Sequence, residues 1–311
     1  MNVIHYQSEY TTIHLGDALN ILPTIPDASV DAIISDPPYP EISRSYGRLT
    51  EWEWAVLMLE VCRQAQRILK PTGSAVFILQ PNSRKVGSMR GWLWEFMAWV
   101  CREWNMVQDV WWWNTSALTT GLCTPRERGL LRASLKACVW CGPNDCYRDQ
   151  DNALWLESQG NKYRRSIAKR FSRDESPSGQ GSSNTARYTS IERGGVTPFN
   201  VLPIPRGGGD TNDVGKHSAS TPLPLADWWT RYICPPKSTI LDPFVGAGTM
   251  GVAALLHGHK FIGIDKEAMY LDISQKRCQE VEQQRDGEMH LRPRRPVERQ
   301  TVKGQMELWE G

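Results

Sequence analysis

Short apolar runs alternate along the chain with longer amphipathic segments. The runs have the length of buried strands and are rich in valine and isoleucine, which favour β-structure. In the longer segments apolar residues recur at helical spacing, and Thr50 with Glu53 forms a capping box before one of them. The alternation predicts an α/β protein with strands at 11–15, 30–35, 74–79, 106–113, 135–141, 199–205, 239–241 and 260–264, and with helices at 18–22, 51–69, 91–105, 249–256, 267–283 and through Trp228 and Tyr232.

One strand leads into a glycine turn and a helix. The strand at 239–241 ends in Asp242, Gly246 and Gly248 open the turn, and Thr249 begins the helix. Such a turn brings backbone N–H groups close to a ligand at the edge of a parallel sheet. The next strand ends in Asp265, about 20 residues after Gly246, the spacing at which a carboxylate can bind the hydroxyls of a ribose. The pattern predicts a nucleoside cofactor; NAD or FAD would favour a third glycine, and an ordinary tight turn is the other alternative.

A second motif lies far upstream. The buried strand at 30–35 runs into Asp36-Pro37-Pro38-Tyr39, so two strands of the chain end in Asp-Pro. The pair Asp-Pro-Pro-Tyr and Asp-Pro-Phe-x-Gly-x-Gly-Thr resembles the DNA amino-methyltransferases that use S-adenosylmethionine, the N6-adenine/N4-cytosine family. The order, with the catalytic motif first, is similar to that of their β group, and the resemblance covers most of residues 11–282 except the stretch near 155–198.

The resemblance implies a domain organisation. The fold would be a doubly wound, mostly parallel seven-stranded sheet with an antiparallel hairpin, formed by 106–113 and 135–141, plus an inserted target-recognition region. Residues 1–150 would form the catalytic half and 199–284 the cofactor-binding half. Residues 151–198 would be the target-recognition insertion, and 285–311 a disordered basic tail.

The resemblance also implies the cofactor contacts. An acid at the position of Asp17 bonds the adenine amino group of the cofactor, although Asp17 is equally suited to cap a helix. The family motif His-Pro-x-x-Lys-Pro is only partly kept, with Ser218 in place of the first proline and Thr221 in place of the lysine. Ser218, Ser220 and Thr221 could still bond a carboxylate. The implied cofactor-binding residues are Asp17, Asp36, His217, Ser218, Ser220, Asp242, Phe244, Gly246, Gly248, Thr249 and Asp265.

The residues 36–39 suit methylation of an exocyclic amino group. The lone pair of that nitrogen is delocalised into the base, so the site must draw the nitrogen toward tetrahedral geometry. Asp36 can accept one amino hydrogen and the Pro37 carbonyl the other, Pro38 stiffens the turn, and Tyr39 offers a ring on which the base can stack. The base must be flipped out of double-stranded DNA to reach them. No metal is needed, and Asp at position 36 favours adenine, because serine is usual in the cytosine-N4 members.

A basic segment with interleaved aromatics lies between the two motifs, where the β group keeps its target-recognition region. Tyr163 and Phe171 could stack on bases or wedge between them, and the alternative is a solvated linker. The cations that could neutralise DNA phosphates are Lys162, Arg164, Arg165, Lys169, Arg170 and Arg173.

Two other features suggest protein partners. The end of the chain resembles the short peptide Gln-Leu-x-Leu-Phe that docks on the bacterial sliding clamp, through Gln305, Leu308 and Trp309; a frayed tail is the alternative. The aromatic stripe Trp92, Phe96 and Trp99 indicates core or interface packing, and an interface would make the protein a homodimer.

Composition limits the alternatives. The chain has 311 residues and 14 Trp, enough for one large α/β domain with an insertion, and its net charge of +2 does not by itself require a nucleic-acid partner. It has no apolar run of membrane length and no signal-peptide pattern, so we expect a cytoplasmic protein with its 8 cysteines reduced. Cys138, Cys141 and Cys146, with Cys123, could form a zinc site, but the strand pattern favours plain buried thiols.

Three functional alternatives stay open beside an adenine methyltransferase. The first is N4-methylation of cytosine. The second is methylation of RNA bases or of glutamine side chains, which the order of the motifs disfavours. The third is a non-catalytic DNA- or clamp-binding regulator, against which the intact residues 36–39 argue. No nuclease motif is evident, so in a restriction–modification pair the nuclease would be a separate protein.

Overall fold

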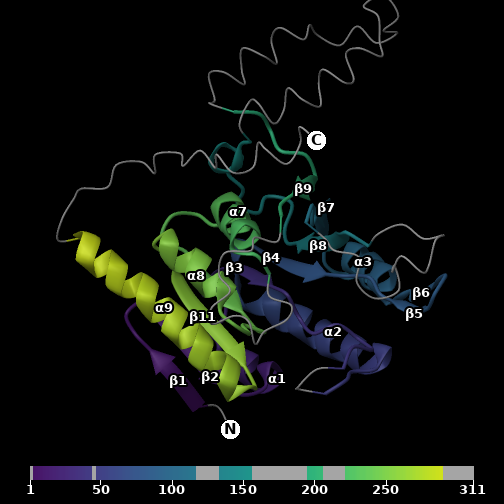
Figure 1. Ribbon diagram of the computed structural model, residues 1–311, viewed down its shortest axis with the longest axis horizontal. Helices are drawn as coiled ribbons and strands as arrows, with labels where there is room; N and C mark the ends of the chain where they lie inside the picture. The colour runs from purple at the N-terminus through teal and green to yellow at the C-terminus, as the bar shows by residue number, and fades with distance from the viewer. Residues whose placement is uncertain (1–2, 44–46, 117–132, 156–194, 206–220, 290–311) are drawn as a thin grey trace, which may run out of the picture.

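The computed structural model describes residues 3–43, 47–116, 133–155, 195–205 and 221–289 (Figure 1). A nine-stranded sheet runs through the molecule, in the spatial order β1-β2-β11-β10-β3-β4-β8-β7-β9. Its strands are β1 (Val3–Gln7), β2 (Thr11–Leu15), β3 (Val30–Ser35), β4 (Leu69–Leu79), β7 (Met106–Trp113), β8 (Leu135–Cys141), β9 (Val201–Pro203), β10 (Thr239–Asp242) and β11 (Lys260–Asp265).

The centre of this sheet is parallel. β2, β11, β10, β3 and β4 pair in parallel, and β8 then pairs antiparallel with both β4 and β7, as the predicted hairpin requires. The seven strands expected from the resemblance lie together. β1 and β9 extend the two edges, so the described sheet has nine strands rather than seven. A separate pair, β5 (Ser83–Lys85) and β6 (Ser88–Met89), follows β4.

Helices cover both faces of the sheet. One buried cluster joins the sheet to α7, α8 and α9, and the other joins it to α1, α2 and α3. The described helices are α1 (Ala18–Ile21), α2 (Glu51–Ile68), α3 (Trp92–Glu103), α7 (Leu223–Ile233), α8 (Thr249–Leu256) and α9 (Ala268–Met289), with 3-10 turns η1 (Leu22–Thr24) and η3 (Asp151–Ala153). The doubly wound α/β fold predicted from the sequence is therefore confirmed.

A local signal accounts for the start of α2 but not for its end. Thr50 and Glu53 form the predicted capping box at the start of α2. The helix was expected to continue to residue 69 and to end in a loop at 70–73. Instead β4 begins at Leu69, because Leu69 already pairs with Val30 of β3. The register then shifts at a bulge, and pairing resumes between Ser74 and Ala32. The sequence 70–73, with its proline and glycine, thus lies within a strand rather than in a loop.

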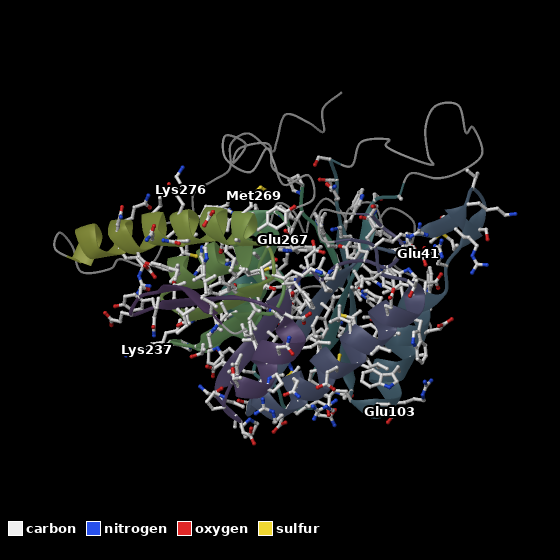
Figure 2. All side chains as sticks on the ribbon, turned by 90° about the horizontal axis from the view of Figure 1, so that it is seen from below. Glu41, Glu103, Lys237, Glu267, Met269 and Lys276 are labelled. Atoms are coloured by element: carbon white, nitrogen blue, oxygen red, sulfur yellow. The ribbon has the colours of Figure 1, made fainter. Side chains whose placement is uncertain are left out.

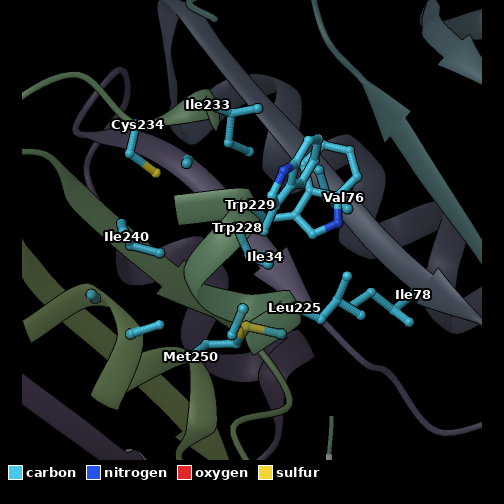
Figure 3. Close-up of a cluster of buried hydrophobic side chains, with 14 of the residues drawn as sticks. Ile34, Val76, Ile78, Leu225, Trp228, Trp229, Ile233, Cys234, Ile240 and Met250 are labelled. Carbon is cyan, nitrogen blue, oxygen red and sulfur yellow. The ribbon is translucent and has the colours of Figure 1, made fainter. Parts of the chain in front are cut away.

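Tryptophans fill both cores. Trp54 of α2 meets Trp92 edge-on, with ring centres 4.5 Å apart, and Phe96 lies beside both. Trp92 and Phe96 are buried, and Trp99 packs against the same cluster, so the aromatic stripe of α3 serves the core. On the opposite face Trp228 and Trp229 of α7 lie over Val76 and Ile34 of the sheet (Figure 3).

The cysteines of β8 are buried thiols. Cys138 and Cys141 lie on the strand predicted for 135–141, and Cys146 is buried nearby. Burial raises the pKa of Cys138 to about 12, so this thiol stays protonated at neutral pH. Among the described helices, none is long and apolar enough to cross a membrane.

A buried carboxylate of the long helix α9 binds three hydroxyls at the edge of the sheet. Glu282, which is buried, accepts hydrogen bonds from the hydroxyls of Tyr6 (2.8 Å), Ser8 (2.6 Å) and Thr11 (2.7 Å). These three residues belong to β1, β2 and the turn between them. One acid thus connects the C-terminal helix to the N-terminal hairpin.

Replacement of this carboxylate should destabilise the fold. Glu282→Ala leaves three hydroxyls without their acceptor, and we expect the free energy of unfolding to fall by about 2–4 kcal/mol. Denaturant unfolding followed by circular dichroism measures the change. Glu280→Ala, two residues earlier on the exposed side of α9, is the matched control and should change the free energy of unfolding by less than about 0.5 kcal/mol. Equal effects of the two substitutions would contradict this anchoring role.

Candidate functional site

The two Asp-Pro motifs meet at one edge of the sheet. β3 and β10 are parallel neighbours, with Ile33 paired to Leu241, so their carboxyl ends lie side by side. A cavity of about 470 Å³ opens there. In doubly wound sheets ligands bind at this edge. The residues named from the sequence that line the cavity are Asp17, Asp36, Pro37, Pro38, Tyr39, Thr221, Asp242, Phe244, Gly246, Thr249 and Asp265.

The glycine turn has the backbone conformation that its sequence predicts. Gly246 and Gly248 have φ of 49° and 78°, in the left-handed region that favours glycine. A Cβ at Gly248 would lie 2.3 Å from the Ser274 hydroxyl of α9. Gly248 does not line the cavity, so its role is to let the turn pack closely on α9, whereas Gly246 lies in the cavity wall.

Asp265 joins this turn to the end of β11. Its two oxygens accept the N–H groups of Gly246 (2.9 Å) and Glu267 (3.0 Å), and its burial raises the pKa of the carboxyl. Each oxygen keeps a second lone pair for a ligand hydroxyl. Asp17 follows the neighbouring strand β2, where the Gly16 N–H donates to the Asp265 carbonyl (2.9 Å). It lines the same cavity and caps α1 by accepting the N–H of Leu19, so the capping role expected for it is confirmed.

Asp242 is the most deeply buried acid of the site. Its side chain is 3% exposed, and Oδ1 accepts the Ser35 hydroxyl (2.6 Å) and the Phe244 N–H (3.0 Å). Loss of hydration raises the pKa of Asp242 to about 7, although those two hydrogen bonds act in the opposite direction. The group is therefore poised to become an anion near neutral pH.

Asp36 stands in a network of donors. The Tyr39 hydroxyl donates to Oδ1, while Oδ2 accepts the Thr221 hydroxyl (2.7 Å) and the Lys136 ammonium (3.3 Å). Thr221 precedes α7, and Lys136 lies on β8. Three separate segments of the chain therefore hold the carboxylate that the sequence identified as the catalytic candidate.

Neighbouring loops fix the turn at 36–39. The Pro38 carbonyl accepts a hydrogen bond from Trp54 Nε1 (2.7 Å), so this carbonyl anchors the turn to α2 and leaves Pro37 as the candidate acceptor. Asn82 donates to the Pro40 carbonyl (2.7 Å), and Glu41 binds Arg48 in the following loop. The polar side chains around this region, with Glu41 and Glu267 labelled, are seen in Figure 2.

Sequence reasoning missed several residues of the site. Ser35 donates a hydrogen bond to Asp242, but the sequence marks it only as the last residue of its strand. Lys136 had a signal, since it is a lone charge within an otherwise apolar strand. Trp52, which is 77% exposed, and Tyr270 also line the cavity.

Some predicted contacts lie outside the described residues. These are the cofactor candidates His217, Ser218 and Ser220, the basic segment at 162–173, and the tail with Gln305, Leu308 and Trp309. Cys123, the fourth residue of the zinc alternative, also lies outside them.

The sequence matches the DNA methylase family N6_N4_Mtase over residues 30–276, a span that contains both Asp-Pro motifs. The chain therefore belongs to the N6/N4 DNA methylase family. It is a DNA methyltransferase, and the cofactor of this family is S-adenosylmethionine.

Individual relatives span most of the chain. The type II methyltransferase M.PvuII of Proteus hauseri is 22% identical and covers 86% of this chain and 84% of its own length. The DNA adenine methyltransferase YhdJ of Escherichia coli (strain K12) is 26% identical, with 88% and 84% covered. The family match, rather than these low identities, carries the assignment.

Solved structures share the fold. The PvuII DNA methyltransferase (cytosine-N4-specific) superposes with a TM-score of 0.67 at 17% identity, over 90% of this chain and 93% of that one. A putative DNA modification methylase from Thermus thermophilus, complexed with S-adenosyl-L-methionine, gives a TM-score of 0.54 at 17% identity, over 88% and 95%.

Cofactor affinity should increase as the pH rises through about 7. Below its raised pKa the Asp242 carboxyl is neutral, whereas above it the carboxylate anion attracts the positively charged cofactor. Calorimetric titration with S-adenosylmethionine between about pH 6 and about pH 8 measures this. The variant Asp242→Asn cannot ionise, so its pH dependence should be weaker; identical pH dependence in both proteins would exclude Asp242 as the cause.

Proposed function

We propose that this protein transfers a methyl group from S-adenosylmethionine to the N6 amino group of a flipped-out adenine at specific sites in double-stranded DNA. The observation that carries the proposal is the presence of the Asp36 carboxylate and the glycine turn in the walls of one cavity. The assignment to adenine, rather than to cytosine, rests on Asp at position 36.

The residues of the cavity fit the cofactor. Asp265, at the end of β11, suits the two hydroxyls of a ribose, and Gly246 lets the backbone approach a ligand closely. Asp36, Asp242 and Asp265 together suit a ligand that carries positive charge. When bound, the cofactor supplies the activated methyl group.

Asp36 would orient the target nitrogen. Its carboxylate accepts one hydrogen of the amino group and the Pro37 carbonyl accepts the other, so the nitrogen lone pair turns out of the plane of the base. Since Asp36 needs only to accept a hydrogen bond, the proton can leave after methyl transfer. Most of the rate enhancement then comes from positioning.

Tyr39 would hold the flipped base. Its ring lines the cavity, and its hydroxyl is fixed by Asp36, so the aromatic face has a defined orientation. Stacking on an aromatic side chain offsets part of the few kcal/mol that unstacking the base costs. The basic segment at 162–173 is the proposed contact with DNA phosphates.

A second candidate is methylation of cytosine at N4. The chain resembles the PvuII enzyme, which is cytosine-N4-specific, over nearly its whole length, and it also resembles an adenine methyltransferase from Escherichia coli. Both bases present an exocyclic amino group beside a ring nitrogen, so the same acceptors serve either reaction.

Nucleoside mass spectrometry distinguishes methylation of adenine at N6 from methylation of cytosine at N4. After incubation of the protein with unmethylated duplex DNA and S-adenosylmethionine, we expect N6-methyladenine in the digest. N4-methylcytosine would overturn the assignment to adenine while keeping the role of Asp36. Cofactor binding without either product would contradict the proposed DNA reaction and direct the search to RNA or protein substrates.

Asp36 should be required for transfer but not for the fold. Because Asp36→Ala removes the acceptor from the target nitrogen, we expect kcat to fall by at least about 100-fold, while calorimetry still detects cofactor binding. Asp36→Asn keeps one carbonyl acceptor at the same place and is the matched control, which should retain more activity. Full activity of Asp36→Ala would rule out the proposed mechanism.

A further inference from the structure

Lys136 brings a positive charge to the carboxylate of Asp36. β8 is antiparallel to β4, so its first residues lie at the edge where the parallel strands end. From there the Lys136 ammonium reaches the Tyr39 hydroxyl at 2.9 Å and Asp36 Oδ2 at 3.3 Å. The lysine therefore touches two of the four residues of the Asp-Pro-Pro-Tyr motif, from a strand about 100 residues away.

The Lys136 side chain is fixed by its packing. Lys136 is directly opposite Trp112 of β7, its Nζ lies 5.2 Å from the centre of the indole ring, and its side chain is only 15% exposed. Trp112 is itself 2% exposed, and its Nε1 donates to the Ile204 carbonyl (2.7 Å). A lysine that served only solubility would extend into solvent, whereas this one is packed against a fixed aromatic wall.

Lys136 shares its acceptor with Thr221. Both donate to Asp36 Oδ2, while the Tyr39 hydroxyl donates to Oδ1 and also accepts from Lys136. The donors come from β8, from the segment before α7 and from the motif itself. Between them they fix the plane of the carboxylate, and only the lysine contributes a full charge.

We propose that Lys136 is a positioning residue for methyl transfer, which holds the Asp36 carboxylate oriented toward the amino group of the target base. This inference rests on the proposed role of Asp36. Because Lys136 and Thr221 donate to Oδ2 and Tyr39 donates to Oδ1, both oxygens of Asp36 are held as acceptors. Such a carboxylate matches a nitrogen that donates its hydrogens.

The positive charge beside Asp36 could also be introduced at another position of the chain. Because the Thr221 side chain reaches the same carboxylate oxygen, an ammonium placed at residue 221 would also lie close to Asp36. Thr221 stands where the family motif has lysine. Replacing Lys136 by a neutral residue and Thr221 by lysine would therefore transfer the charge from β8 to the segment before α7, beside the same carboxylate.

Four variants test the proposal. Lys136→Met keeps the aliphatic length and removes the charge, and Lys136→Arg keeps the charge. The double variant Lys136→Met/Thr221→Lys moves the charge, and Thr221→Val removes a neutral donor. For each, kcat and KM for duplex DNA are measured by methyl incorporation, cofactor affinity by calorimetry, and Tm by thermal unfolding.

We expect kcat of Lys136→Met to fall by about 10- to 100-fold, the usual loss when a residue supporting a reactive group is removed. KM for DNA and cofactor affinity should change little, because the Lys136 ammonium bonds Asp36 and the Tyr39 hydroxyl and does not itself line the cavity. Lys136→Arg should retain more activity than Lys136→Met, and the double variant should recover part of the lost kcat. Thr221→Val should cost less than Lys136→Met, since a neutral donor contributes less than a charged one.

The outcomes that overturn the proposal differ from those that overturn the function. If Asp36→Ala is inactive but Lys136→Met keeps its kcat, Asp36 acts without the lysine. A raised KM for DNA with unchanged kcat makes Lys136 a phosphate contact instead. If the Tm of Lys136→Met falls and neither Lys136→Arg nor the double variant recovers kcat, the lysine only stabilises the fold. Activity of Asp36→Ala, by contrast, removes the proposed function itself.

Discussion

The site depends on a property of parallel strands, whose carboxyl ends gather at one edge of a sheet. Ser35 and Asp242 are 207 residues apart in sequence, yet they share a hydrogen bond because β3 and β10 are neighbours. Neither Asp-Pro motif forms a site alone. The pairing of these two strands joins the glycine turn to the Asp-Pro-Pro-Tyr turn, and it therefore creates the cavity in which a cofactor and a base can meet.

Bringing acids together at this edge has an electrostatic cost. Burial raises the pKa of Asp242 and of Asp265, which means that the protein environment disfavours their charged forms. The chain offsets this with local donors: a hydroxyl for Asp242, backbone N–H groups for Asp265, and an ammonium with two hydroxyls for Asp36. In the proposed site, a positively charged cofactor would add further compensation. The preference of the cavity for such a ligand follows from its charges as well as from its shape.

Much of the fold and of the site could be predicted from sequence because the signals are local. Apolar runs located the central strands, the capping box located α2, and the glycines at 246 and 248 located a turn that needs positive φ. The edge strand β1 was missed, since its side chains are largely exposed and its pattern is weak. Lys136 and Glu282 were missed for another reason: each contacts residues far away in sequence. The lone charge of Lys136 in an apolar strand marks it as unusual but does not identify its distant partners.

The most direct test is a crystal structure with sinefungin, an analogue of S-adenosylmethionine in which an amino group on carbon stands in place of the methyl group on sulfur. We expect the ribose hydroxyls to bond Asp265 and the amino group to lie within hydrogen-bonding distance of Asp36, at the point where the methyl group would leave. An analogue bound elsewhere, or bound in the cavity with its amino group turned away from Asp36, would contradict a shared site for cofactor and target base.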